Sequence, residues 1–449
     1  MIATLRAAPT RARLILFAFG DFAFNLYWQS IMLFLLFYYS DALGLPVTTA
    51  ATIYTIASIW DGIANFAAGA LADRREPGRG YGRVLMVGSI PLGIACVLTY
   101  IPPPVSGYWA IAFVTVGHLL FRTAYAAANI PYLAMTARIS LDSKDRAFVA
   151  GMRMFFGTMA WVTVASTTIP LGGWLSGSHV PAHAFLGAAA FFAVIATAIL
   201  LLVGATYRED AMPVRTAPPS LAASVASLVS NRAFVTLNLA MVAALVAVTV
   251  LNKSVLYYFK YFLGDDAAGQ TALAWMGVAS GAAVLGWMLL QRVTGARTLW
   301  FLATGSCMAG LMLFALLHID RIATMQLFLV VMQALIVGIH FVFWAMLPNT
   351  IEYGEHETGL RIEGAVVGAA ALLQRVAIGI ATTALGWGFG ASGYVANVQQ
   401  SAATLAGMRW TIILIPLGFF TLSCVLMLLN PLGKGEHARI VRRLAGGDS

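Results

Sequence analysis

Long apolar segments separated by short polar stretches dominate this chain of 449 residues. Each is long enough to cross a hydrocarbon core about 30 Å thick as a helix, which takes roughly 20 residues. These runs are continuous, unlike the alternating segments of about ten residues in an outer-membrane barrel, so they predict an all-α integral membrane protein. We expect twelve spans, near 14–39, 47–71, 84–101, 108–135, 149–173, 183–206, 233–262, 269–291, 298–318, 323–349, 364–389 and 408–430.

One polar connection, residues 207–232, is long and contains Pro213, Pro218 and Pro219. Six predicted spans precede it and six follow it. The count predicts two six-helix bundles, 1–206 and 233–449, with a cytoplasmic loop between them and a short cytoplasmic tail. This arrangement is typical of secondary transporters, in which the substrate binds near the bilayer midplane where the two repeats meet.

Lysine and arginine alternate between rich and poor loops. Basic residues gather before the first predicted span, near 74–83 and 138–146, within 207–232 and in the tail, whereas 101–108 and 174–181 contain none. The positive-inside rule therefore predicts that both termini are cytoplasmic, in a multi-pass protein of the inner membrane. The first apolar span is too long for the h-region of a cleavable signal peptide.

The composition excludes a water-soluble protein. Hydrophobic residues make up 60% of the chain and charged residues 10%, with a mean hydropathy of +0.83, whereas soluble domains carry about 25% charged residues. The net charge of +9 comes from basic residues spread between apolar segments, so we expect no nucleic-acid partner. Motifs of serine hydrolases, zinc proteases and P-loop ATPases do not occur in the sequence, so we expect neither an enzyme nor a cofactor.

Charged residues inside predicted spans are functional candidates, because an ionisable side chain at membrane depth is costly. They include Asp21, Asp61, Arg122, Arg153 and Arg375. Asp61 and Asn65 lie four residues apart, which places both on one helix face turned toward the bundle interior. This pair suits a cation or proton site, and it also suits an interior salt bridge from Asp61 to Arg122 or Arg375. The two roles are compatible.

Several other polar residues in the predicted spans have two possible roles each. Asp21, nearer the cytoplasmic end of the first span, suits a gating ion pair or a hydrated position as well as a substrate contact. Asn25, one turn deeper, suits either a hydrogen bond to substrate or interhelical packing. Asn129 precedes Pro131, which frees a backbone carbonyl, so it marks either a binding site or an ordinary kink. For His118 we favour a hydrogen-bonded packing role.

Four motifs carry a resemblance to known transporters. The sequence Gly69-Ala70-Leu71-Ala72-Asp73-Arg74 resembles the G-x-x-x-D-R loop signature of the major facilitator superfamily, which assigns Asp73 and Arg74 to gating or charge pairing. Residues 20–41, 130–153 and 352–364 resemble one branch, the glycoside, pentoside and hexuronide cation symporters typified by the melibiose permease. The most specific stretch, 352–364, looks like that branch's loop between the tenth and eleventh helices.

The resemblance implies a sugar site at the midline and a cation site beside it. It assigns substrate contacts to Asn25, Asn129, Arg153 and Arg375, and cation or proton coupling to Asp61 and Asn65. Asn25, Asn65 and Asn129 are amides where the branch has acids, which weakens the inference of sodium coupling. A proton needs one titratable group, whereas a dehydrated sodium ion needs several oxygen ligands, so we favour H⁺ over Na⁺ as the co-transported cation.

These observations predict a secondary active transporter that imports a sugar or glycoside by cation symport. Arg122, Arg153 and Arg375 outnumber Asp21 and Asp61, so we hypothesise an acidic sugar such as a hexuronide. The alternatives are a carrier of lysolipids or other amphiphiles on the same fold, a sugar uniporter, and a membrane receptor or scaffold without transport. We expect the small-molecule substrate and the lipid bilayer as partners, and a monomer.

Overall fold

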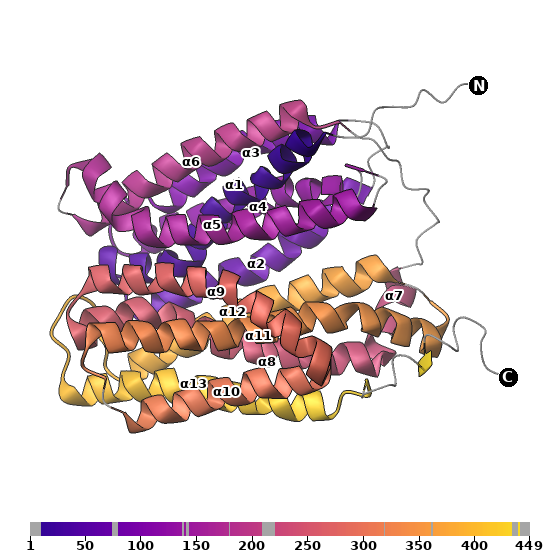
Figure 1. Ribbon diagram of the computed structural model, residues 1–449. Coiled ribbons are helices and arrows are strands. Elements are labelled where there is room, and N and C mark those ends of the chain that lie inside the picture. The colour runs from indigo at the N-terminus through magenta and orange to yellow at the C-terminus, as the bar shows by residue number, and fades with distance from the viewer. Residues whose placement is uncertain are drawn as a thin grey trace. The chain divides into compact units, whose positions relative to one another are not determined.

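A computed structural model describes residues 10–73, 80–136, 139–140, 143–178, 180–208, 221–317, 319–360, 362–432 and 439–440. Helices make up its regular structure (Figure 1). The first half contains α1 (Arg11–Phe37), η1 (Tyr38–Ala42), α2 (Val47–Asp73), α3 (Tyr81–Thr99), α4 (Tyr108–Thr136), α5 (Ser143–Ser176) and α6 (Pro181–Thr206). The second contains α7 (Leu221–Ser230), α8 (Arg232–Tyr258), η2 (Phe259–Leu263), α9 (Asp266–Thr294), α10 (Ala296–Leu316), α11 (Ile322–Thr358), α12 (Glu363–Ala391) and α13 (Ala402–Leu428).

Eleven helices of the described residues are long and apolar enough to cross a membrane. They coincide with eleven of the twelve predicted spans, and the remaining one is α2. At 27 residues, α2 is about 40 Å long and also exceeds the hydrocarbon thickness. Asp61, Asn65 and four threonines lie along it. The predicted all-α membrane architecture is confirmed.

Two helices extend into segments that the sequence pattern assigned to loops. The ten-residue α7 lies inside the connection predicted at 207–232. Helix α11 continues past the predicted end at residue 349 to Thr358, so most of the motif at 352–364 is helical and not loop. Gly359, with φ +68°, ends this helix, and its N–H donates to the Glu355 carbonyl. A change from apolar to polar residues therefore does not require a helix to end there.

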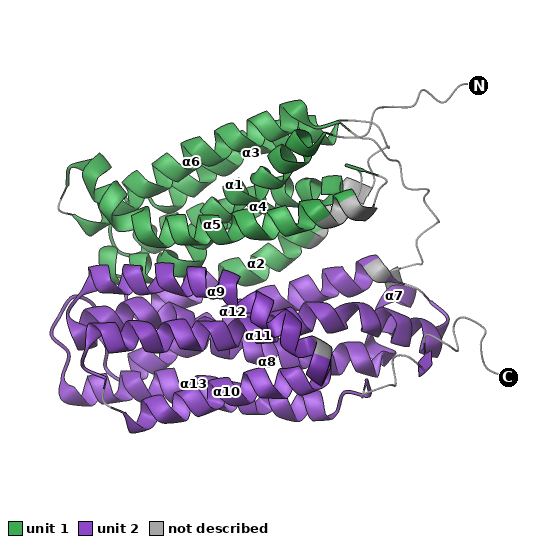
Figure 2. Cartoon of the chain, viewed as in Figure 1, with its two compact units in different colours: residues 1–45, 56–215 green, residues 46–55, 216–449 purple. Residues whose placement is uncertain are grey.

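The chain forms two compact units (Figure 2). Unit 1 contains residues 1–45 and 56–215, and unit 2 contains 46–55 and 216–449. The division falls within α2, whose first residues belong to unit 2. There, Thr55 Oγ1 donates to the Gly379 carbonyl at 3.0 Å and lies 2.5 Å from Thr383 Oγ1 of α12.

The first long helix of each unit ends in the same way. Helix α1 runs into the π-helical segment η1, and α8 runs into η2. Each π segment is followed by a glycine in the left-handed region, Gly44 at φ 72° and Gly264 at φ 69°. A side chain at that φ is strained, which explains the glycines. This shared ending is a local repeat between the two halves of the chain.

Small residues set the helix spacing inside unit 1. A Cβ added to Gly172 of α5 would lie 1.8 Å from the Ala184 carbonyl oxygen of α6, and one added to Gly82 of α3 would lie 2.3 Å from the Gly204 carbonyl oxygen of α6. Such contacts let backbones approach closely where lipid supplies little hydrophobic driving force.

Candidate functional site

Asp61 of α2 and Arg122 of α4 form a buried ion pair in unit 1. Arg122 Nη1 lies 3.6 Å from Asp61 Oδ2, and the side chains are 1% and 0% exposed. Arg122 Nε donates to His118 Nε2 at 3.2 Å, and its guanidinium carbon lies 5.0 Å from the centre of a Trp28 ring. The opposite charge, the imidazole and the aromatic face together offset the cost of burying the guanidinium.

Asn65 completes this cluster from the same helix as Asp61. Its Nδ2 donates to the Asp61 carbonyl oxygen at 2.7 Å and to Asp61 Oδ1 at 3.0 Å. The amide therefore presents its N–H groups to the carboxylate. A metal cation would need the Asn65 oxygen instead, which requires the amide to rotate. In this arrangement Asp61 is the anionic group of the cluster.

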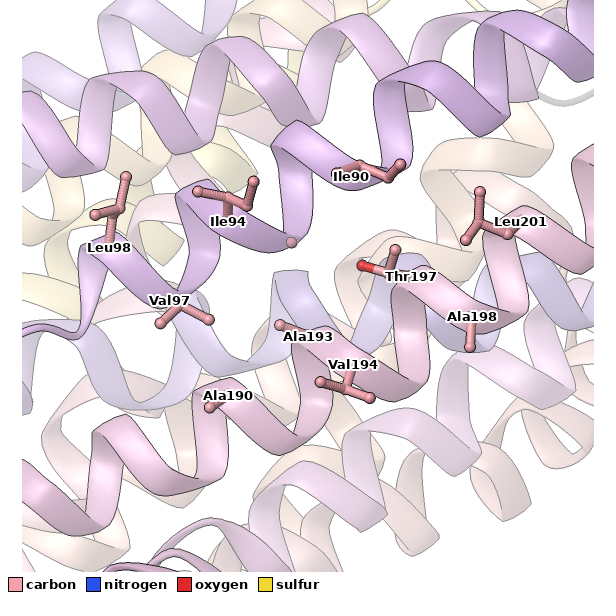
Figure 3. A pocket seen from close by; sticks show the side chains of 11 residues that line it. Ile90, Ile94, Val97, Leu98, Ala190, Ala193, Val194, Thr197, Ala198 and Leu201 are labelled. Carbon is pink, nitrogen blue, oxygen red and sulfur yellow. The ribbon is translucent and has the colours of Figure 1, made fainter.

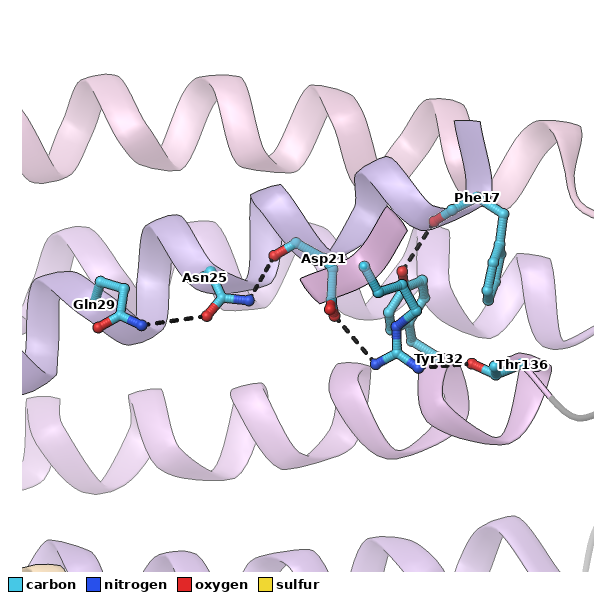
Figure 4. A network of polar contacts seen from close by, with 7 residues as sticks. Phe17, Asp21, Asn25, Gln29, Tyr132 and Thr136 are labelled. Carbon is cyan, nitrogen blue, oxygen red and sulfur yellow. Dashed lines mark hydrogen bonds and ion pairs between the residues drawn. The ribbon is translucent and has the colours of Figure 1, made fainter. Parts of the chain in front are cut away.

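A second ion pair joins α1 to α5 near the helix ends (Figure 4). Arg153 Nη2 lies 3.2 Å from Asp21 Oδ1, and Arg153 Nη1 donates to Thr136 Oγ1 at 3.0 Å. The guanidinium also lies 5.2 Å from the ring centre of Tyr132, whose hydroxyl donates to the Phe17 carbonyl at 2.9 Å. The start of α1, the end of α4 and the start of α5 meet here. The contact joins Asp21, predicted as a gating residue, to Arg153, predicted as a substrate contact.

The two predicted amide contacts lie on α1 and α4 of unit 1. Asn25 Nδ2 donates to the Asp21 carbonyl at 2.8 Å, and Asn25 Oδ1 accepts from Gln29 Nε2 at 3.4 Å (Figure 4). Gly157 of α5 leaves room for this amide, because a Cβ there would come within 3.2 Å of Asn25 Nδ2. Asn129 is buried in α4, which continues past Pro131.

Aromatic residues between the two ion pairs were missed in the sequence analysis. Phe24 lies 5.0 Å from Tyr132 and 5.7 Å from Tyr125, and Tyr125 lies 5.6 Å from Trp28, all between ring centres. Trp28 and Gln29 follow Asn25 at intervals of three and four residues, a spacing that places them on one helix face. That spacing could have identified Trp28 from the sequence as a neighbour of the predicted substrate contact Asn25. Aromatic faces with a few polar groups are typical linings of small-molecule sites.

Unit 2, taken by itself, contains basic residues within predicted spans, two of which are Arg375 and Lys253. Arg375 is half-buried on α12. Lys253 of α8 is 4% exposed, and its Nζ lies 3.7 Å from the centre of the Tyr54 ring. The Asp73 side chain and Arg74, predicted for gating, lie outside the described residues. Within the described residues, no group of three or more His, Cys, Asp or Glu could hold a metal ion.

Comparisons with known proteins identify the family. A family model described as MFS/sugar transport protein matches residues 16–434. The chain is 26% identical to the glucuronide carrier protein homolog of Escherichia coli K12, over 95% of this chain and 93% of that protein. It is 24% identical to the isoprimeverose transporter of Lactiplantibacillus pentosus, over 94% of this chain and 88% of that protein. A solved D-xylose-proton symporter shares the fold, with a TM-score of 0.67 and 12% identity over 94% of this chain and 98% of that one. Because the family model covers most of the chain, this multi-pass membrane protein belongs to the MFS/sugar transport proteins of the major facilitator superfamily, as its motifs predicted.

Proposed function

We propose that this protein imports a sugar or glycoside by cation symport and that Asp61 is the coupling group. The observation that carries the proposal is the fully buried Asp61 carboxylate, held by Arg122 at 3.6 Å in a member of a sugar-transport family. A buried carboxylate with one guanidinium partner is a site where a cation competes directly with that partner. The alternative is a purely structural ion pair, and in that case changing Asp61 would not alter the coupling of transport to a cation.

The competition supplies a mechanism for coupling. When a proton or cation occupies Asp61, the attraction between Asp61 and Arg122 falls, and the guanidinium loses the carboxylate that balances its charge. A buried guanidinium whose charge is less well balanced is unfavourable, so it gains by taking a new hydrogen-bond acceptor, such as a hydroxyl or carboxylate of the substrate. Cation loading therefore favours substrate binding. In the reverse direction, substrate release restores the pair.

The geometry favours H⁺ over Na⁺ as this cation. Asn65 directs its N–H groups to Asp61, so in this arrangement the carboxylate has no amide oxygen beside it from Asn65 to complete a sodium shell. Uptake of labelled sugars into proteoliposomes, with imposed proton and sodium gradients varied independently, tests this. We expect uptake to rise as external pH falls. Uptake that follows sodium and ignores pH would instead assign Asn65 to a sodium site.

For the substrate we propose an acidic sugar, such as a hexuronide. Two of the arginines that suggested an anion are paired with Asp61 and Asp21. The third, Arg375, lies half-buried on α12 of unit 2. The 26% identical relative is named for glucuronide and the 24% identical one for isoprimeverose, so relatives of this scaffold carry both acidic and neutral sugars. The test is to compare how strongly a glucuronide, and the glucoside of the same aglycone, inhibit uptake of a labelled substrate. Equal inhibition by the two compounds would remove the preference for an anion.

The topology and assembly remain part of the proposal. Both termini are cytoplasmic in it, the two bundles correspond to 1–206 and 233–449, and the transporter acts as a monomer. The family description names sugar transport, which favours a sugar over the lysolipid alternative. A sugar uniporter differs from the symporter in one observable: it equilibrates its substrate and never concentrates it.

A further inference from the structure

A groove on the side of unit 1 opens between α2, α3 and α4. It has a volume of about 580 Å³, and its described lining is mostly alanine, valine and isoleucine. Ala64, Ala67 and Ala127 line it, while Ile63 and Val87 are 54% and 73% exposed. In a membrane protein such a surface faces acyl chains. Small side chains on the helices leave the hollow, because larger ones would fill it.

The described lining of the groove ends near the middle of α2, at Trp60. Trp60 Nε1 of α2 donates to Thr123 Oγ1 of α4 at 2.8 Å, and both residues line the groove. From Trp60 to Ala68, its last lining residue on α2, the helix rises by about 12 Å, close to half of a 30 Å hydrocarbon core. The groove therefore has the depth of one lipid leaflet.

Arg83 is the only charged residue among the described lining residues. It is exposed in the first turn of α3, at the end of the groove opposite Trp60. In the topology that the loop charges predict, this end is cytoplasmic. Basic groups at the cytoplasmic edge of a pocket between transmembrane helices suit anionic lipid headgroups.

A second groove in unit 1 has a similar volume to the α2–α3–α4 groove, but no charged residue in its described lining. It lies between α3 and α6, and its volume is about 540 Å³ (Figure 3). The one hydroxyl of its described lining, from Thr197, lies 2.9 Å from Tyr27 Oη. On α3 it begins at Ile90, two turns beyond Arg83. This groove fits acyl chains of any lipid and distinguishes no headgroup.

We propose that the α2–α3–α4 groove is a binding site for one anionic phospholipid, with an acyl chain between Trp60 and Ala68 and the phosphodiester at Arg83. The apolar lining fits the chain, the leaflet depth fits its length, and the guanidinium fits the negative headgroup. The Trp60–Thr123 end adjoins the proposed coupling pair, since Trp60 precedes Asp61 and Thr123 follows Arg122. A lipid seated here wedges α2 and α4 at the spacing at which that ion pair forms. The proposal does not depend on which sugar is carried.

The test is lipid binding to purified, delipidated protein by native mass spectrometry. Phosphatidylglycerol and phosphatidylcholine with identical acyl chains serve as probes. We expect one phosphatidylglycerol to bind about fivefold more tightly than phosphatidylcholine, because one arginine near the headgroup is worth about that factor. Arg83→Gln should bring the ratio close to one, whereas Arg83→Lys should keep it. Arg232→Gln, which removes an exposed arginine of unit 2, is the matched control and should change nothing.

A second pair of variants locates the acyl chain. Ala127→Phe fills the α2–α3–α4 groove and should remove the selective phosphatidylglycerol, whereas Ala198→Phe fills the α3–α6 groove and should leave it bound. If Ala127→Phe fails to fold, a phosphatidylglycerol with a photoreactive acyl chain should label α2–α4 peptides of the wild-type protein. Equal affinity for the two lipids, an unchanged ratio in Arg83→Gln, or labelling confined to other helices would overturn the proposal.

Discussion

Arg122 and Asp61 meet in a part of unit 1 that solvent does not reach, with Nη1 3.6 Å from Oδ2. The residues beside them, Trp60 and Thr123, are hydrogen-bonded at 2.8 Å. Helices α2 and α4 are therefore bridged twice within one helical turn, once by charge and once by a neutral hydrogen bond. Only the charged bridge changes strength when Asp61 binds a proton or a cation. It is therefore the contact through which ion binding can alter the packing of α2 against α4.

Asp61→Asn should abolish concentrative uptake and leave substrate exchange intact. The amide keeps the size of the side chain but cannot bind a proton or balance Arg122. Transport in proteoliposomes with and without an imposed gradient measures both activities. Asp265→Asn is a suitable control, because Asp265 Oδ1 caps α9 by accepting from the Ala268 N–H at 2.8 Å and asparagine caps equally well. Concentrative uptake that survives in Asp61→Asn would contradict the coupling role.

The Asp21–Arg153 pair should show energetic coupling. Asp21→Asn and Arg153→Gln each leave a half-buried charge without its partner, so each should lower the melting temperature. The double variant should be more stable than the sum of the two losses predicts, by about 0.5–3 kcal/mol. Thermal unfolding of the four proteins gives this coupling energy. Losses that simply add would mean that the 3.2 Å contact contributes nothing measurable.

Gly172→Ala should destabilise the protein, and Gly173→Ala should not. A Cβ at Gly172 would lie 1.8 Å from the Ala184 carbonyl oxygen, whereas one at Gly173 meets nothing within 4 Å. Both are helical and adjacent, so helix propensity affects them equally. Overpacking of this kind costs about 1–3 kcal/mol. The difference between the two melting temperatures is the measurement, and similar values would show that α5 and α6 separate without cost.

Trp28→Ala should weaken sugar binding about tenfold, while Trp28→Phe should retain most of the affinity. Trp28 is half-buried, shares a helix face with Asn25 and lies over Arg122, so its ring is placed to form one wall of a sugar site. An aromatic face contributes about 0.5–1.5 kcal/mol beyond the area that it buries. Substrate titration by calorimetry gives the affinities. Trp174→Phe, at a side chain that is 78% exposed, is the control, and an unchanged Trp28→Ala would exclude this wall.

A reporter fused to the C-terminus should be active only in its cytoplasmic form. The prediction follows from the alternation of basic and neutral loops, because positively charged loops are retained in the cytoplasm. A pair of reporters, one active in each compartment, makes the measurement, with a fusion in the loop at 101–108 as the opposite control. A C-terminus that reads as extracytoplasmic would reverse the topology and place Arg83 in the other leaflet.

Much of the fold could be predicted from the sequence because membrane insertion is decided locally. A run of about 20 apolar residues needs a helix wherever it sits, since its own backbone must satisfy its hydrogen bonds in lipid. The helix ends were harder. Polar residues near 352–358 predicted a loop, yet α11 continues through them, and α7 forms where a loop was expected. Water stabilises either conformation there, so packing selects one.

The sequence by itself determined which side chains are costly at membrane depth, and so singled out Asp21, Asp61, Arg122 and Arg153. It could not determine the pairs, because Asp61 had two candidate arginines and both lie far along the chain. Only the tertiary structure decided that Arg122 pairs with Asp61 and Arg153 with Asp21. The physical reason is distance: a charge interaction inside a bundle depends on a few ångströms of helix spacing and rotation, and long-range packing sets these.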